Sequence, residues 1–312
     1  MKFELTILGC GSATPTLKHW PTSQLLEHDS HYFLIDCGEG TQLQLRRYKA
    51  KYQKIRHVFI SHNHGDHFLG LPGLISTMHL LGRTIPLHIY AQRGLKEAVE
   101  HQLEISHSHL RFELVWHHPD PSEKQKIFEN KKIEVYSFPL SHRIECCGYL
   151  FREKEKLRNI KPEYIEKFNI PVPRIRQIKA GADYKLDDGT VIPNEELTIS
   201  PEPPLSYAFC SDTAYRVETA EYVRGVDVLY HESTFLESEK ARAKETYHST
   251  AAEAATVARD AGAGKLLLGH YSARYRTDKP FLEEAKAIFD NTELADEGKV
   301  VQVEKVRNKF RA

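Results

Sequence analysis

The chain has 312 residues, enough to bury a sizeable core in one or two domains. Its 43 basic and 43 acidic residues balance, so any RNA contact must come from local basic patches rather than from net charge. No apolar run approaches the ~18 residues of a membrane span, the first residues lack a signal peptide, and the five cysteines lack a disulfide spacing, so we expect a cytoplasmic protein without a membrane partner.

Segments with a strand pattern recur along the chain between segments of helical spacing. Alternating or short apolar segments predict strands at 3–8, 31–35, 55–60, 86–91, 112–116, 133–138, 148–151, 207–210, 226–230, 265–268 and 300–306. Apolar residues at helical spacing predict helices at 71–81, 95–105, 250–261 and 281–290. The pattern predicts an α/β fold in which helices flank layered sheets.

The stretch of residues 152–200 differs from the sequence on both sides of it. It is rich in Lys, Arg, Glu and Pro, which predicts an inserted arm within a single domain of residues 1–312. Inside it, Arg174, Arg176 and Lys179 suit phosphate contacts if the segment is extended, because alternate residues then project to one side. The alternative is a solvated surface loop.

Four possible metal ligands lie within six residues, directly after the apolar strand 55–60. They are His62, His64, Asp66 and His67, and imidazole and carboxylate are the ligands expected of zinc or a related metal. Gly65 lets the backbone turn so that side chains on both sides of it can converge. The alternative is a solvated loop, because this many polar groups would be costly to bury unpaired.

Three later residues repeat one arrangement, in which a possible ligand follows an apolar strand. They are His142, Asp212 and His270. Open α/β sheets place their binding sites at the carboxyl ends of strands, so we expect these residues near the first cluster. Seven such side chains suit a pair of metals, although a histidine after a strand is also common in loops and cores.

The His-x-His-x-Asp-His motif of residues 62–67 resembles that of the metallo-β-lactamase superfamily. Four further motifs make the chain more narrowly similar to the ribonuclease Z family: Leu-Gly-Cys-Gly-Ser-Ala-Thr-Pro at 8–15, Asp-Cys-Gly-Glu-Gly-Thr-Gln at 36–42, His-Glu-Ser-Thr-Phe at 231–235 and His-Ser-Thr at 248–250. The similarity runs from residue 2 to about residue 275.

This resemblance implies a fold, a cofactor and a set of ligands. The fold would be a four-layer αββα sandwich with a flexible inserted arm, and the cofactor would be two zinc ions per subunit. One zinc would be held by His62, His64 and His142 and the other by Asp66, His67 and His270, with Asp212 bridging them.

The resemblance also implies an activity, namely endonucleolytic cleavage of precursor tRNA after the discriminator nucleotide, which leaves a 3′-hydroxyl on the tRNA. A hydroxide held by the metals would attack the phosphodiester, with Asp66 as the general base. His248 would protonate the leaving oxygen or stabilise the phosphate, and Glu232 would orient it. The alternative for His248 is a loop residue beside the cap of the helix 250–261.

The family resemblance further implies a homodimer whose arm clamps the tRNA, with no DNA partner. Residues 169–181 keep a Pro-rich turn and a terminal glycine but lack the Gly-Pro dipeptide of the family's arm. One rival hypothesis is another dinuclear zinc phosphodiesterase, or an arylsulfatase-like hydrolase, on the same fold. A second rival is a non-catalytic RNA-binding protein, but such a protein would be expected to have lost ligands, and all seven are present.

Overall fold

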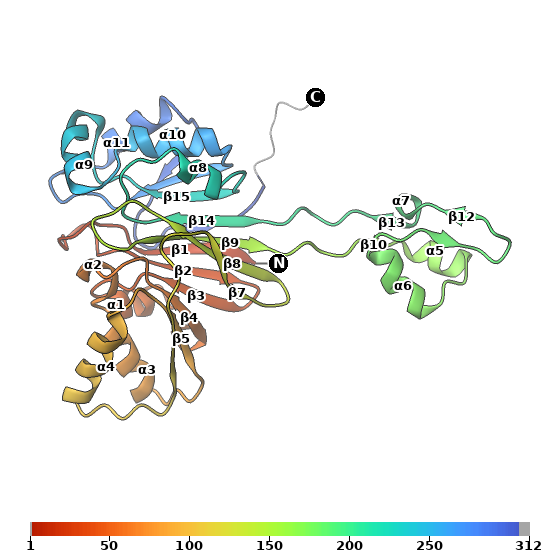
Figure 1. The fold of residues 1–312 in the computed structure, drawn as a ribbon, viewed down its shortest axis with the longest axis horizontal. Helices are drawn as coiled ribbons and strands as arrows, with labels where there is room; N and C mark the ends of the chain where they lie inside the picture. The colour runs from red at the N-terminus through yellow and green to blue at the C-terminus, as the bar shows by residue number, and fades with distance from the viewer. Residues whose placement is uncertain (1, 306–312) are drawn as a thin grey trace. The chain divides into compact units, whose positions relative to one another are not determined.

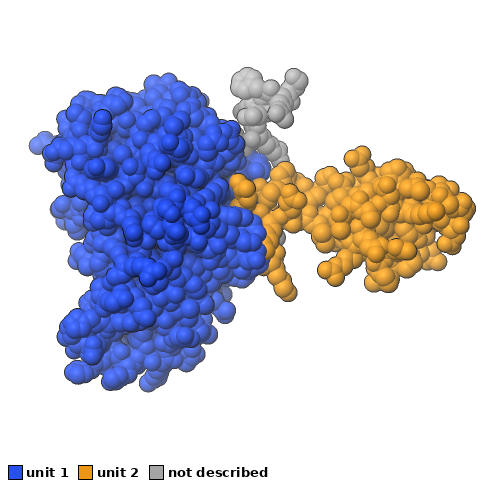
Figure 2. Space-filling model, in the orientation of Figure 1, with its two compact units in different colours: residues 1–130, 134–151, 205–312 blue, residues 131–133, 152–204 orange. Residues whose placement is uncertain are grey.

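Two seven-stranded sheets form the centre of the larger of the chain's two compact units (Figure 1). The structure is a computed structural model that describes residues 2–305. The larger unit comprises residues 1–130, 134–151 and 205–312, and the smaller unit comprises residues 131–133 and 152–204, as the colours of Figure 2 show.

The first sheet combines an antiparallel half with a parallel half. In sheet order its strands are β18 (Val300–Gln302), β1 (Phe3–Gly9), β2 (Ser23–His28), β3 (His31–Ile35), β4 (Ile55–Phe59), β5 (Leu87–Tyr90) and β6 (Leu114–His117). Pairing is antiparallel from β18 to β3 and parallel from β3 to β6.

The second sheet has a parallel half in which whole strands are buried. In sheet order its strands are β17 (Thr292–Leu294), β16 (Lys265–Gly269), β15 (Val228–Glu232), β14 (Ser206–Cys210), β9 (Cys147–Glu153), β8 (Ile133–Pro139) and β7 (Gln125–Glu129). Strands β14 to β17 pair in parallel, and every residue of β14 and β15 is buried. Such continuous burial is expected where both faces of a parallel sheet are covered.

Helices cover the outer faces, and aromatic side chains fill the space between the sheets. The helices of the larger unit are α1 (Thr41–Arg47), α2 (Gly65–Phe68), α3 (Leu71–Leu80), α4 (Leu95–Ile105), α8 (Glu218–Tyr222), α9 (Lys240–Thr246), α10 (Ala251–Ala261) and α11 (Lys279–Lys286). Figure 1 shows α1, α3 and α4 beside the first sheet and α8, α10 and α11 beside the second. Phe33 and Phe59 of the first sheet meet Phe151 and Tyr149 of the second, so the layers run αββα.

The smaller unit has a small apolar core of its own. Its elements are β10 (Asn159–Ile160), α5 (Pro162–Lys167), α6 (Val172–Lys179), β11 (Tyr184–Lys185), β12 (Val191–Ile192), α7 (Asn194–Leu197) and β13 (Thr198–Ile199). Ile170, Ile178 and Leu197 are buried together in it. The unit is inserted between β9 and β14, which are neighbours in the second sheet.

Most of the expected elements are confirmed with shifts of a few residues, and one expectation is wrong. The strand 31–35 and the helix 95–105 have the bounds expected, whereas α11 begins at Lys279 because Pro280 is accommodated in its first turn. The last strand ends at Gln302, and Val306 lies outside the described residues. The segment of Arg174, Arg176 and Lys179 is not extended but forms α6, since Pro173 likewise fits a first turn.

Within residues 2–305, no helix combines the length and the apolar character that crossing a bilayer requires.

Candidate metal centre

The seven candidate ligands come from four places in the chain and meet at the carboxyl ends of four strands. His62 and His64 follow β4, and Asp66 and His67 lie on the short helix α2 directly after them. His142 follows β8, Asp212 follows β14 and His270 follows β16, so all three later ligands lie just beyond strands of the second sheet.

One set of donor atoms belongs to His62, His64, His142 and Asp212, whose ligand atoms all lie within 4.8 Å of one another. Nδ1 of His64 lies 3.0 Å from Nε2 of His62 and 3.1 Å from Nε2 of His142. Oδ2 of Asp212 lies 3.7 Å and 3.8 Å from the same two Nε2 atoms. Three imidazole nitrogens and one carboxylate oxygen therefore face one point.

A second set consists of Asp66, His67 and His270, and Asp212 joins it through its other oxygen. Oδ2 of Asp66 lies 3.4 Å from Nε2 of His67 and 3.6 Å from Nε2 of His270. Oδ1 of Asp212 lies 3.4 Å and 3.0 Å from those nitrogens. The two oxygens of Asp212 thus face different sets, as a bridging carboxylate requires.

Hydrogen bonds on the side away from the centre orient the imidazoles of His142 and His67. Nδ1 of His142 donates to the Tyr247 carbonyl at 3.0 Å, and Nδ1 of His67 donates to Oδ2 of Asp36 at 2.7 Å. Carbonyl and carboxylate oxygens only accept, so both rings carry their proton on Nδ1. In the neutral rings this leaves the lone pair of Nε2 directed at the centre, which is the tautomer that binds a metal.

Three buried polar atoms at the centre have no hydrogen-bond partner within residues 2–305. They are Nε2 of His67, Nε2 of His270 and Oδ1 of Asp212. An unsatisfied buried polar atom costs about 1–3 kcal/mol, so three of them facing one another are unfavourable unless something binds between them. The donor set therefore fits a cation, because imidazole and carboxylate are ligands of zinc and related metals.

The pKa shifts of the histidines also indicate that the two sets fit a cation. Burial lowers the pKa values of His62, His64 and His142, so these rings are neutral and their lone pairs are available. Burial also lowers the pKa of His67, but the carboxylates of Asp212 and Asp66 outweigh it and raise that pKa well above its usual range. Without a metal, a proton on His67 supplies the positive charge that these carboxylates attract.

His248 and Glu232 form a hydrogen-bonded pair beside the two sets. Nδ1 of His248 donates to Oε1 of Glu232 at 2.9 Å and lies 4.0 Å from Oδ2 of Asp212. Burial lowers the pKa of His248, but Glu232 outweighs it and raises the pKa to about 9, so the ring is an imidazolium at neutral pH. The hydroxyl of Thr234 donates to Glu232 at 2.8 Å and contacts Nδ1 of His270 at 2.9 Å.

An open cavity of about 480 Å³ lies over both sets. Five of the seven candidate ligands line it, together with His248. The other lining residues are Ser12, Ala13, Gly65, Leu69, Arg143 and Thr246. Arg143 is the one Lys or Arg side chain among the residues that line it, so it adds a permanent positive charge to the wall.

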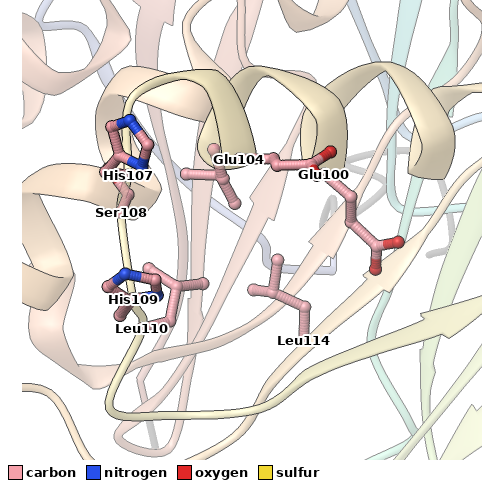
Figure 3. A pocket seen from close by; sticks show the side chains of 8 residues that line it. Glu100, Glu104, His107, Ser108, His109, Leu110 and Leu114 are labelled. Carbon is pink, nitrogen blue, oxygen red and sulfur yellow. The ribbon is translucent and has the colours of Figure 1, made fainter.

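A second cavity, of about 550 Å³, lies beside α4 and lacks a comparable donor set. Figure 3 shows Glu100 and Glu104 on α4, with His107 and His109 on the segment after it. Among residues 2–305, none of these four belongs to a group whose ligand atoms lie within 4.8 Å of one another. The third sequence-predicted group, Arg174, Arg176 and Lys179, lies on α6 of the smaller unit.

Sequence reasoning missed Asp36, Thr234 and Arg143. Asp36 and Thr234 stand in the motifs 36–42 and 231–235, but their partners His67 and His270 are 31 and 36 residues away. Arg143 directly follows His142, and its place beside a candidate ligand is the signal that could have found it.

The stacked sheets with paired His/Asp sets at one end define the class of the protein as a metallo-β-lactamase fold. The metallo-β-lactamase fold protein YhfI of Bacillus subtilis superposes with a TM-score of 0.68 at 18% identity, covering 97% of this chain and 100% of that one. The family model of the anti-Pycsar protein Apyc1 matches residues 3–157.

More similar proteins narrow the class to one family. A ribonuclease Z of Bacteroides fragilis is 48% identical over 296 residues, which cover 95% of this chain and 97% of that protein. The crystal structure of human tRNase Z, short form, superposes with a TM-score of 0.70 at 26% identity, covering 96% of this chain and 99% of that one. The chain belongs to the ribonuclease Z family.

Proposed function

We propose that this protein is a zinc-dependent endoribonuclease that cleaves the 3′ trailer from precursor tRNA after the discriminator nucleotide. The observation that carries the proposal is the paired donor set at the strand ends, with Asp212 facing both halves. The similarity to proteins named ribonuclease Z supports it, because it covers nearly the whole length of both chains. A cytoplasmic homodimer with precursor tRNA as its partner is part of the proposal.

Two zinc ions per subunit fit the donors. His62, His64 and His142 would hold one, and Asp66, His67 and His270 would hold the other, with Asp212 shared between them. When bound, zinc supplies a Lewis acid at the phosphodiester and lowers the pKa of a coordinated water to about 7.

The chain's own residues would move the protons. Asp66 is the candidate base that takes a proton from the attacking water, whose oxygen then bonds to phosphorus. The bond from phosphorus to O3′ of the tRNA breaks as His248, an imidazolium beside Glu232, gives its proton to that oxygen. Arg143 in the cavity wall would neutralise phosphate charge near the scissile bond.

The smaller unit would be the tRNA-binding arm. Arg174 and Arg176 are exposed on α6, and Lys179 is half-buried at its end, so the helix can offer cations to backbone phosphates. Phosphate contacts of this kind make binding weaken steeply with salt.

The experiment that tests the function maps the cut in precursor tRNAs, with and without an encoded CCA end. We expect cleavage after the discriminator nucleotide and a 3′-hydroxyl on the tRNA. His64→Ala and Asp212→Ala should lose both zinc and cleavage, whereas His101→Ala, whose side chain is 70% exposed on α4, should keep both.

Full zinc content with full cleavage in the two ligand variants would remove the site. Hydrolysis of a small phosphodiester or a sulfate ester without any cleavage of precursor tRNA would favour another hydrolase of the same fold. An absence of both zinc and hydrolysis in the unaltered protein would favour a non-catalytic RNA-binding protein.

A further inference from the structure

The loop between β1 and β2 connects an exposed tip directly to the candidate metal centre. At the tip, the amide of Ala13 donates to Oδ2 of Asp66 at 2.8 Å, the same oxygen that faces His67 and His270. At the base, the Cys10 carbonyl accepts the amide of His270 at 2.8 Å. Two candidate ligands are therefore bonded to this loop.

The conformation of the tip requires support from the rest of the loop. Ala13 has φ 51°, in the left-handed region that residues other than glycine rarely adopt. The tip itself is exposed, with the Leu17 side chain fully in solvent. Such a conformation persists only when surrounding contacts determine it. Here they are the bond from Ala13 to Asp66, the bond from the Ser12 amide to the Tyr271 carbonyl at 3.1 Å, and the contacts at the buried ends of the loop.

His19 and Glu297 hold both ends of the loop. His19 is 5% exposed, and its Nδ1 donates to Oε2 of Glu297 at 2.9 Å while its Nε2 donates to Oδ2 of Asp278 at 3.0 Å. A neutral imidazole donates from one nitrogen only, so this arrangement requires the imidazolium. Oε1 of Glu297 also accepts the amides of Trp20 at 2.9 Å and Cys10 at 3.3 Å.

Cys10, His19 and Glu297 also lie within the distance that would suit a metal, but their hydrogen bonding differs from that of the candidate metal centre. Both nitrogens of His19 and both oxygens of Glu297 have partners inside the protein. At the candidate metal centre, Nε2 of His67 and Oδ1 of Asp212 have none within residues 2–305. The satisfied cluster is better described as an ion triad that includes Asp278.

We propose that His19 is a positioning residue for the metal centre: held between Glu297 and Asp278, it fixes the loop of residues 10–20 so that the Ala13 amide orients the Asp66 carboxylate. The proposal rests on the proposed function in that Asp66 is taken as a metal ligand. It assigns a task to a group of residues that lies outside the ligand sets and outside the cavity.

The test replaces His19 by glutamine, which keeps one donor but neither the charge nor the bridge between two carboxylates. We expect His19→Gln to bind zinc about tenfold more weakly. This is the low end of the roughly 10- to 100-fold loss of affinity that follows from mutating residues that orient metal ligands. In metal-free protein, amide hydrogen exchange over residues 10–20 should speed up, while exchange in α10 stays unchanged. Exchange in metal-free protein does not depend on activity, so it reports the loop alone.

Glu293→Gln is the matched control. Glu293 lies in the same part of the chain and has two cationic partners, Lys265 and Lys299, each at 2.7 Å, but no contact with the loop. It should leave both the loop exchange and the zinc affinity unchanged. If His19→Gln proves unfolded in a thermal melt, Asp278→Asn replaces it, because this variant keeps an acceptor for Nε2 of His19 and removes one charge. Asp278 also pairs with Lys18, so Lys18→Gln is measured beside it to separate the two effects.

The zinc affinity should also respond to pH through His19. Burial lowers the pKa of His19, but hydrogen bonds to Asp278 and Glu297 outweigh it and raise the pKa to about 9. The titratable and charged groups that face or adjoin the ring are Cys10, Lys18, Tyr271, Asp278, Asp296 and Glu297. At neutral pH the unaltered protein should bind zinc more tightly than His19→Gln, and this difference in affinity should disappear as the pH rises through about 9.

Two results would overturn the positioning role. One is loop exchange and zinc affinity in His19→Gln equal to those of Glu293→Gln. The other is an equivalent of zinc that Asp212→Ala retains and His19→Gln loses, which would make the triad a metal site. If precursor tRNA is not cleaved by the unaltered protein, the proposed function fails, but loop exchange and zinc affinity still decide the role of His19.

Discussion

The Asp36 carboxylate is buried beside the candidate ligand His67 and decides where that imidazole carries its proton. It accepts Nδ1 of His67 at 2.7 Å and both the amide and the hydroxyl of Ser61, at 2.8 and 3.0 Å. An asparagine would turn either an amide NH₂ or a weaker acceptor toward His67. In the first case the ring proton moves to Nε2, and the lone pair is lost to the metal.

We therefore expect Asp36→Asn to weaken metal affinity about 10- to 100-fold in a protein that still folds. Zinc titration with a competing chelator measures this. Asp227→Asn is the control, because Asp227 is also buried and accepts hydrogen bonds from the amide and the hydroxyl of Ser206, at 2.8 and 3.1 Å. Asp227 is not among the candidate ligands or their partners. Equal affinities in the two variants would contradict a role for Asp36 in orienting His67.

His248 lines the cavity and is hydrogen-bonded to Glu232, and its Nδ1 lies 4.0 Å from the nearer oxygen of Asp212. If it protonates the leaving oxygen, His248→Ala should keep its zinc and cleave precursor tRNA about 10²–10⁴-fold more slowly. The rate of hydrolysis of a p-nitrophenyl diester should fall far less, because p-nitrophenolate leaves without needing a proton. Turnover of both substrates at saturating concentration measures this difference. Equal losses on both would mean that His248 acts by stabilising phosphate charge instead.

At the scale of elements, the helix that carries Asp66 and His67 is held against the turn after β3 by close backbone approach. The Cys37 amide donates to the His67 carbonyl at 2.7 Å, and the Gly70 amide donates to the Cys37 carbonyl at 2.9 Å. A Cβ on Gly70 would lie 2.1 Å from the Gly38 carbonyl oxygen, closer than atoms can approach. The α2–α3 junction therefore requires glycine for steric reasons.

Gly70→Ala should push α2 away from this turn and cost about 1–3 kcal/mol in the free energy of unfolding, with loss of bound metal. Gly82→Ala at the other end of α3 is the control. Gly82 has φ 81° with nothing within 4 Å of its Cβ position, so alanine there costs about 1–2 kcal/mol without touching the centre. Denaturant unfolding and zinc content distinguish the two; normal zinc in Gly70→Ala would contradict the packing argument.

The parts of the fold that sequence predicts are those in which the cause is local. The strand 31–35 is a short apolar run, and α4 repeats Leu95, Val99 and Leu103 at helical spacing, so both are confirmed with their bounds. Strand β2 was missed because Leu25 and Leu26 are both buried, which removes the alternation. Helix α6 was not predicted, because its charged and Pro-rich sequence indicated an inserted arm rather than a core element.

The same distinction applies to the candidate site. Residues 62–67 are recognisable because four donors lie within six residues after a strand. The task of Asp36 is not visible locally, since it arises from the parallel pairing of β3 with β4, which brings the ends of two strands together. The support that His19 gives the loop depends on Asp278 and Glu297, more than 250 residues further along the chain.

At the scale of the whole molecule, the two units can be separated genetically because of where the smaller one is inserted. Cys146 contacts the Asp212 carbonyl and Gly148 lies against the Phe209 carbonyl, so β9 and β14 run in opposite directions. The chain thus leaves β9 and enters β14 at the same end of the sheet, where neighbouring strands are about 5 Å apart. A short glycine-serine linker can replace residues 155–195 without displacing either strand.

The protein with this deletion should keep its zinc and its hydrolysis of a small phosphodiester but bind precursor tRNA weakly.

Replacing Arg174, Arg176 and Lys179 by alanine in the full chain should lower the slope of log affinity against log salt by up to about 3, since each phosphate contact contributes about 0.9. A control variant removes three exposed cations of the larger unit, Lys49, Lys51 and Arg259. Affinities measured between 50 and 200 mM salt, roughly the range in which such contacts matter most, decide the question. If the α6 variant keeps the salt slope of the control, or if the deletion leaves tRNA affinity intact, then the smaller unit is not the RNA-binding arm and the cations that hold tRNA must belong to the larger unit.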